Sequence, residues 1–202
     1  VEITGVATGF PYGQFSYSAD LGPRIFGLVP YLLPVSWVPL VLGAVAATER
    51  RSGAGALRVT GWTLSAAVLL TALDGVLDPG AAKLGFWEWS QGGPYYGVPL
   101  SNYRGWLLSS LLASALLIAV LPWKTTTPAP GMLDSTFIAL AFWTSVALFT
   151  GLVIPVVLGT ILFTGLLARR VALQRHATSA TRVTPPGRAG SPYGASGAEK
   201  VH

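Results

Sequence analysis

The amino-acid sequence predicts an all-α, polytopic integral membrane helical bundle with about five spans. Of its 202 residues, 51% are hydrophobic and only 10% are charged, whereas charged residues make up about a quarter of a soluble domain. The charges are separated by long apolar stretches, and a spanning helix needs about 20 apolar residues. The 24 Gly and 15 Pro are more than soluble helices carry, but membrane helices tolerate both. These observations argue against an ordinary soluble enzyme.

The first three spans follow from gaps between charged residues. One helix fits between Arg24 and Glu49, and another fits between Arg104 and Lys124. The gap between them is short, but residues 57–77 reach the required length if Asp74 lies inside the span. The sequence therefore predicts a carboxyl group within a membrane-spanning helix.

The fourth gap, between Asp134 and Arg169, is too long for one straight helix. We expect two helices, at residues 133–150 and 153–168, with a tight turn near Gly151. Pro155 then falls in the first turn of the second helix, where its missing N–H costs nothing. The alternative is one long tilted helix with a proline kink, which would leave the basic C-terminal tail outside.

Loop charges predict the orientation of a multi-pass cell-membrane protein. Cytoplasmic loops carry an excess of Lys and Arg, which places Arg50, Arg51, Arg58 and Lys124 inside. The acidic connection at residues 78–103 would be outside. The net charge of +5 thus reflects membrane topology, and we expect no nucleic-acid partner.

Two domains are expected. Residues 1–170 would form a membrane-embedded catalytic domain, and residues 171–202, rich in Ala, Ser, Thr, Gly, Pro and Arg, a disordered basic cytoplasmic tail. Residues 1–23 have no basic start and no apolar core, so they do not read as a signal peptide. Their Gly and Pro pattern predicts irregular or re-entrant backbone, which persists at membrane depth only when buried in protein or lining a cavity.

Acidic and aromatic residues gather in three segments, residues 2–24, 74–78 and 85–106, all predicted near the outer face. Five of the eight acids lie there: Glu2, Asp20, Asp74, Asp78 and Glu88. Asp74 and Asp78 share one face of a helix, one turn apart. They would cost several kcal/mol at the edge of hydrocarbon unless paired or protonated. They could be functional, or they could pair with Arg104, Lys83 or backbone donors and lock the bundle.

Two further acids each admit two interpretations. Glu88, between Trp87 and Trp89, could be a carboxylic acid in an apolar cage that donates a proton, or a solvated acid in an interfacial aromatic belt. Glu2 is followed by Gly5 and Gly9, a spacing that permits close helix packing, or it could be freely solvated. The sequence lacks Cys and has two His, which excludes thiolate and His-rich metal sites.

Two longer patterns carry a resemblance to a known family. The first is Glu2-x-x-Gly5-x-x-Thr8-Gly9-Phe10-Pro11-Tyr12-Gly13-x-Phe15-x-Tyr17, followed by Leu21-Gly22-Pro23 and by Val29-Pro30 with Trp37. The second is Asp74-x-x-x-Asp78-Pro79, Gly85-x-Trp87-x-Trp89 and Gly93-x-Tyr95-Tyr96-Gly97-Val98-Pro99-Leu100-x-Asn102-Tyr103-x-Gly105-Trp106. Together they resemble the bacterial and archaeal carotenoid-biosynthesis membrane protein family over about residues 2 to 165.

That resemblance implies a carotenoid 1,2-hydratase, a hydro-lyase that adds water across the terminal C1–C2 double bond of a linear ψ end group. The substrate would be lycopene, γ-carotene or a bacterioruberin precursor, reached from the lipid bilayer, and other carotenoid-pathway enzymes are possible partners. Family members usually carry further membrane helices before the Glu-x-x-Gly motif, whereas here that motif starts the chain, so by this resemblance the sequence would lack N-terminal helices.

Hydration of such an alkene requires a protonated acid, aromatic faces for the cation and a polar group for water, but no metal or redox cofactor. We expect Asp74 or Asp78 as the proton donor, with Glu2 next. The remaining carboxylates, Glu88 and Asp20, would position water together with Asn102. The substrate-binding set would comprise Tyr12, Tyr17, Trp87, Trp89, Tyr95, Tyr96, Asn102 and Trp106.

Three other functions compete with this one. A membrane prenyl transferase would use Asp74 and Asp78 as half of a Mg²⁺-diphosphate site, but a second Asp-rich motif is absent. A transporter or small channel would suit broken backbone and intramembrane acids, but the sequence shows no internal repeat. A non-catalytic scaffold of the carotenoid pathway is the third.

Overall fold

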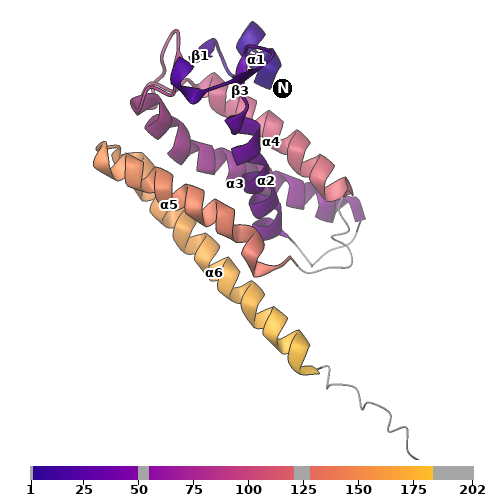
Figure 1. Ribbon diagram of the computed structural model, residues 1–202. Helices are drawn as coiled ribbons and strands as arrows, with labels where there is room; N and C mark the ends of the chain where they lie inside the picture. Colours follow the sequence, from indigo (N-terminus) through magenta and orange to yellow (C-terminus); the bar gives the residue numbers. More distant parts are fainter. Residues whose placement is uncertain (1, 50–54, 121–127, 184–202) are drawn as a thin grey trace, which may run out of the picture.

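The computed structural model describes residues 2–49, 55–120 and 128–183, with side chains described as far as residue 178 (Figure 1). The helices of these ranges are α1 (Glu2–Thr8), α2 (Leu32–Thr48), α3 (Gly55–Lys83), α4 (Leu100–Val120), α5 (Asp134–Phe149) and α6 (Val153–Val183). The short strands are β1 (Phe15–Tyr17), β2 (Arg24–Ile25), β3 (Val29–Pro30) and β4 (Trp87–Trp89). Two 3₁₀ turns cover Ala19–Leu21 and Pro130–Leu133.

The predicted membrane bundle is confirmed. Among the described residues, four helices are long and apolar enough to cross a membrane: Gly55–Lys83, Leu100–Val120, Pro130–Phe149 and Val153–Thr178. The apolar helix α2 is shorter, with 17 residues. The fourth gap contains two helices, because α5 ends before Gly151 (φ +77°) and α6 begins just after it, with Pro155 in its first turn. The alternative of one kinked helix is therefore wrong.

Two helices extend beyond their predicted ends. Helix α6 continues to Val183, so residues 171–183 are helical, and the expectation of a disordered tail is wrong for them. The remainder of that tail, and the charges Arg50, Arg51 and Lys124, lie outside the described residues.

Helix α3 runs through Pro79 to Lys83, although Pro79 predicts an end at Asp78. A proline lacks the N–H that would bond the carbonyl four residues earlier, here that of Gly75. The Tyr95 hydroxyl donates to that carbonyl at 3.0 Å, which replaces the missing donor and lets the helix continue.

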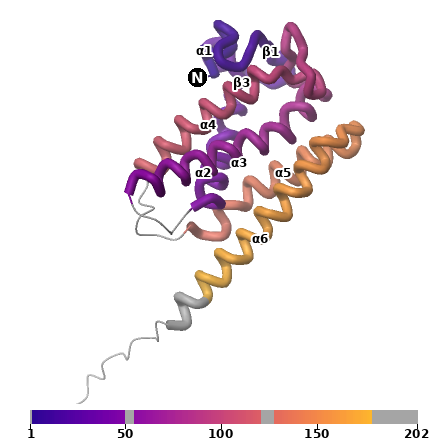
Figure 2. The backbone as a smooth tube through the Cα atoms, turned by 180° about the vertical axis from the view of Figure 1, so that it is seen from behind, coloured from indigo at the N-terminus to yellow at the C-terminus, as the bar shows by residue number. Residues whose placement is uncertain are grey.

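Helix α3 lies at the centre of the bundle. It packs against α2, α4, α5 and α6, while α5 and α6 form an antiparallel pair along one side (Figures 1 and 2). Small residues allow close approach, since a Cβ on Gly43 would overlap Thr136, and one on Gly159 would overlap Thr144. Such close packing stabilises helix association in lipid, where the hydrophobic effect contributes little between helices.

One end of the bundle is covered by a cap, which we define as residues 2–30 and 84–99 (Figure 1). Its centre is the antiparallel pair of β1 and β4, in which Tyr17 faces Trp87 and Phe15 faces Trp89. Alternation along β4 buries both tryptophans and leaves Glu88 exposed. The cap lies at the end opposite to the C-terminal end of α6.

Candidate active site

Two buried carboxyl groups on α3 form the centre of the candidate site. Asp74 is 8% exposed and Asp78 is 2% exposed. They are one helical turn apart on the same face, and their carboxyl groups lie close enough to interact. Buried acids are rare inside membrane helices and usually mark functional positions.

The two carboxyl groups differ in how fully their oxygens are hydrogen-bonded. Asp78 accepts from Trp87 Nε1 at 3.2 Å through one oxygen, and from Asn102 Nδ2 through the other. Asp74 Oδ2 is buried and has no hydrogen-bond partner among the described residues. Neither acid forms an ion pair within this part of the chain, and the two candidate partners, Arg104 and Lys83, are exposed. Neutral groups therefore donate the hydrogen bonds to this pair, and Asp74 Oδ2 is the oxygen without a donor among the described residues.

A third carboxyl group approaches from the cap. Tyr17 donates its hydroxyl hydrogen to Glu2 Oε1 at 2.5 Å. Burial raises the pKa of Glu2, against the opposing effect of that hydrogen bond. Burial, followed by the charge of Glu2, also raises the pKa of Tyr17, so the phenol remains the donor.

Tyr12 is clamped between two helices that are far apart in sequence. A Cβ on Gly5 of α1 would lie 2.6 Å from one edge of its ring, and a Cβ on Gly105 of α4 would overlap the other edge. Its hydroxyl shares a 2.5 Å hydrogen bond with Ser109, and burial raises the pKa of Tyr12 to about 12. The close packing expected at Gly5 therefore serves to hold an aromatic side chain. Gly9 instead ends α1 with φ +78°.

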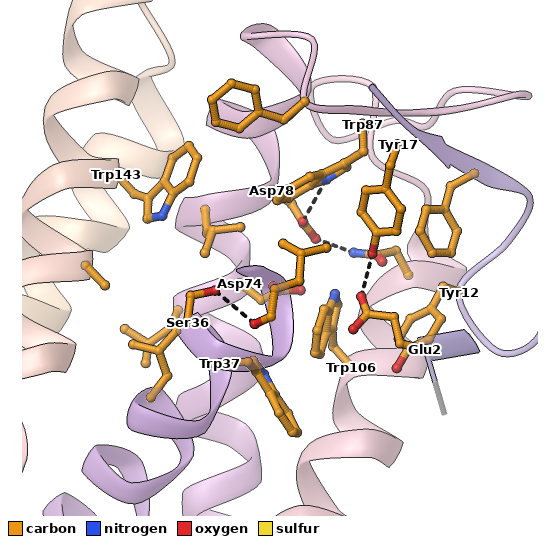
Figure 3. A pocket seen from close by; sticks show the side chains of 18 of the residues that line it. Glu2, Tyr12, Tyr17, Ser36, Trp37, Asp74, Asp78, Trp87, Trp106 and Trp143 are labelled. Carbon is orange, nitrogen blue, oxygen red and sulfur yellow. Dashed lines mark hydrogen bonds between the residues drawn. The ribbon is translucent and has the colours of Figure 1, made fainter. Parts of the chain in front are cut away.

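These groups line a cavity of about 310 Å³, near the lower limit for small-molecule sites. The carboxyl groups of Asp74 and Asp78 lie between Trp143 of α5 on one side and Glu2 with Tyr17 on the other (Figure 3). Nine predicted site residues line the cavity: Glu2, Tyr12, Tyr17, Asp74, Asp78, Trp87, Trp89, Asn102 and Trp106. No Lys or Arg is among the described residues that line it.

Four predicted site residues lie elsewhere. Asp20 and Glu88 are exposed, so the apolar cage expected around Glu88 is wrong: the strand turns this side chain away from Trp87 and Trp89. Tyr95 donates to Gly75 outside the cavity, and the Tyr96 hydroxyl accepts from the N–H of Ile154 at 3.3 Å. Both tyrosines therefore support the helices around the site.

Sequence reasoning missed several lining residues, of which the aromatic ones are Phe15, Trp37, Phe86 and Trp143. Trp37 packs on Trp106 with ring centroids 5.6 Å apart, and Trp143 packs edge-on against Phe86 at 6.2 Å. Phe15, Phe86 and Trp37 fall in segments or motifs that the sequence singles out. Trp143 lies in an apolar helix with no local signal, and only the packing of α5 against α3 brings it to the cavity.

The arrangement combines acids with an apolar, aromatic enclosure. It can supply a proton and can hold a cation against ring faces. The described residues that line it offer no cationic side chain for an anionic substrate such as a diphosphate. The chemistry favoured here is therefore acid catalysis on an apolar molecule.

Comparison with known proteins agrees with this chemistry. The family model described as "Carotenoid biosynthesis protein" matches residues 1–166. The chain is 40% identical over 172 residues to bisanhydrobacterioruberin hydratase of Haloarcula japonica. The match covers 83% of this chain and 58% of that relative, so the chain spans little more than half of the relative's length. No solved structure matches the chain.

Proposed function

The chain belongs to the carotenoid biosynthesis protein family, and from this premise we propose that it is a carotenoid hydratase. It adds water across the terminal C1–C2 double bond of a linear carotenoid end group. The observation that carries the proposal is the buried Asp74–Asp78 pair lining an aromatic cavity without a cationic side chain among its described lining residues. A cavity of this size accommodates an end group, and the rest of the polyene extends from it.

Asp74 is the proton donor in this proposal. Two ionised carboxylates in contact, buried and without a cationic side chain among the described residues around them, would repel each other at high cost, so the pair shares one proton. Trp87 and Asn102 both donate to Asp78, and donated hydrogen bonds favour an ionised acceptor. The proton therefore resides on Asp74, whose Oδ2 has no partner among the described residues.

The reaction then balances without a further reagent. The O–H bond of Asp74 breaks, and its proton forms a bond to C2 with the electron pair of the double bond. The tertiary cation left at C1 is stabilised by the ring faces of Trp87 and Trp106, which line the cavity. Water adds to C1 through its oxygen and returns one proton to Asp74, which restores the acid.

The orientation that the loop charges predict would give access to both reactants. The acidic and aromatic cap would face the outside, and the C-terminal end of α6, with Arg169, Arg170 and Arg175, the cytoplasm. Leu32 and Val35 near the start of α2 are exposed, and Leu32 also lines the cavity. This apolar edge is where a lipid-dissolved carotenoid enters.

The test is conversion in a host that accumulates lycopene. Pigments are extracted and analysed by chromatography and mass spectrometry for a product heavier by one water. The unchanged chain should yield that product, and Asp74→Asn should lower the yield by roughly 10²-fold or more, because general acid catalysis is worth that much. Asp134→Asn is the matched control, since Asp134 is an exposed residue at the start of α5. No product with the protein present in the membrane, or full activity of Asp74→Asn, overturns the proposal.

A further inference from the structure

A hydratase with an apolar cavity needs a separate supply of water, and the structure contains a second cavity that fits this need. This second cavity, of about 430 Å³, lies in the cap and against the start of α4. The polar side chains that line it are Thr8, Gln14, Gln91 and Ser101. We call it the vestibule. Its lining contains hydroxyl and amide groups and no charged side chain among the described residues, which suits water.

Trp89 forms part of the wall of both cavities. It is 8% exposed, and its Nε1 is buried with no hydrogen-bond partner among the described residues. A buried indole N–H normally has an acceptor, and a water oxygen can serve as that acceptor. Trp87, its neighbour on β4, already donates to Asp78.

The contact of Cδ1 places the pyrrole edge of the Trp89 ring on the vestibule side. Cδ1, the atom bonded to Nε1, would lie 3.7 Å from a Cβ on Gly13, and Ser101 Oγ would lie 2.9 Å from the same position. Gly13 and Ser101 both line the vestibule. Gly13 has φ +95°, a conformation that favours glycine, and it places no side chain between Ser101 and the pyrrole edge of Trp89.

We propose that the vestibule admits the water of the reaction and that the Trp89 N–H binds it at the wall of the catalytic cavity. This inference rests on the proposed function. The water oxygen accepts the Trp89 N–H, and the indole ring separates bulk water from the carbon centre. Controlled delivery is needed because the cation at C1 has two fates. It adds water, or it loses a proton to a carboxylate and returns to an unhydrated alkene.

Deuterium separates these two fates. Membranes containing the chain are incubated with lycopene in D₂O, so that Asp74 carries deuterium. A cation that captures water yields a hydrated product with one carbon-bound deuterium at C2. A cation that loses its original proton instead yields an unhydrated carotenoid that retains the deuterium. The ratio of hydrated to unhydrated deuterated carotenoid measures water delivery, and their sum measures protonation.

Two variants test the vestibule. Trp89→Phe keeps an aromatic wall and removes the N–H, and Gln91→Trp fills the vestibule from an exposed position. Each should lower the ratio by roughly fivefold, the size expected for one neutral hydrogen bond. For Gln91→Trp, which does not line the catalytic cavity, the sum should stay near that of the unchanged chain. Trp62→Phe is the matched control: it also removes a buried indole donor, which bonds the Val45 carbonyl at 2.9 Å, away from both cavities.

Each outcome has a distinct meaning. A lowered ratio in both variants, with the control unchanged, supports the vestibule. An unchanged ratio in both variants, or an equal fall in ratio for Trp62→Phe, overturns it. A parallel loss of both deuterated products in Trp89→Phe assigns that tryptophan to substrate binding or to the fold instead of to water delivery, and also overturns it. Absence of deuterium from all carotenoids with the unchanged chain instead refutes the hydratase proposal itself.

Discussion

Gly105→Ala should destabilise the protein by displacing Tyr12. The new Cβ would lie 2.9 Å from Tyr12 Cε1 and 3.0 Å from Cγ, and closer still to Cδ1. Carbon atoms pack at about 3.5–4.0 Å, so the ring would have to retreat by roughly 1 Å. The backbone of Gly5 blocks retreat on the opposite side, and the hydroxyl is held by Ser109.

The cost follows from these contacts. Overpacking in a well-packed core costs about 1–3 kcal/mol, and loss of the Tyr12–Ser109 hydrogen bond adds about 0.5–1.5 kcal/mol. Ala is favoured over Gly within a helix by up to about 1 kcal/mol, which offsets part of this. We therefore expect a net destabilisation of about 1–3 kcal/mol.

Thermal unfolding in detergent measures this cost against a matched control. A Cβ added to Gly165 of α6 would have no neighbouring atom within 4 Å, so Gly165→Ala should be neutral or slightly stabilising. In a Tyr12→Leu background the smaller, flexible side chain should remove most of the Gly105→Ala penalty, which gives a coupling energy above about 1 kcal/mol. The packing of Tyr12 against Gly105 is refuted if Gly105→Ala and Gly165→Ala unfold at the same temperature. It is also refuted if Gly105→Ala costs as much stability in the Tyr12→Leu variant as in the unchanged chain.

Three further predictions concern charged groups. Asp78→Asn should cost about 1–3 kcal/mol in thermal unfolding, because the two donors reach different oxygens of Asp78 and the amide NH₂ group would face one of them. Asp74→Asn should leave stability nearly unchanged while it lowers hydration by roughly 10²-fold or more, and equal melting of the two variants would contradict this. Burial raises the pKa of Glu2, so its stabilising contribution is full below its ordinary value of 4.5 and is lost as pH rises through the folded pKa. As the pH rises above 4.5, the unfolding temperature of Glu2→Gln should therefore fall less than that of the unchanged chain. Arg169→Ala should cost about 1–2 kcal/mol, because its guanidinium donates to two carbonyls at the end of α2, whereas Arg170→Ala, which breaks an exposed ion pair, should cost less than about 0.5 kcal/mol.

Properties that depend on local sequence could be predicted. Gaps between charges located five helices, because a charge within hydrocarbon is costly and each gap therefore marks a span. The four-residue spacing placed Asp74 and Asp78 on one face of α3. The sequence also shows the alternation in Trp87-Glu88-Trp89. If this segment is taken as a strand, Glu88 points to the face opposite the two tryptophans.

Properties that depend on distant pairing could not be predicted. The antiparallel contact of β1 with β4 joins residues that are far apart in sequence and brings Tyr17 beside Trp87. Trp143 reaches the cavity because α5 packs on α3, and nothing adjacent to it in sequence signals this position. Hydrophobic periodicity gives little help here, since a helix that faces lipid on one side and protein on the other is apolar all round.

Tyr95 shows how a residue can serve a site without lining it. Helix α3 must pass Pro79 to keep Asp78 buried within a helix and to lead the chain into β4. An interior proline costs about 3 kcal/mol or more in a helix, partly because it leaves a carbonyl unbonded. The phenol of Tyr95 supplies the donor for that carbonyl, on Gly75, one residue after Asp74. The loop that carries Tyr95 thus fixes the backbone between the two acids, and Tyr95 affects the candidate site through the geometry of α3 instead of through contact with the cavity.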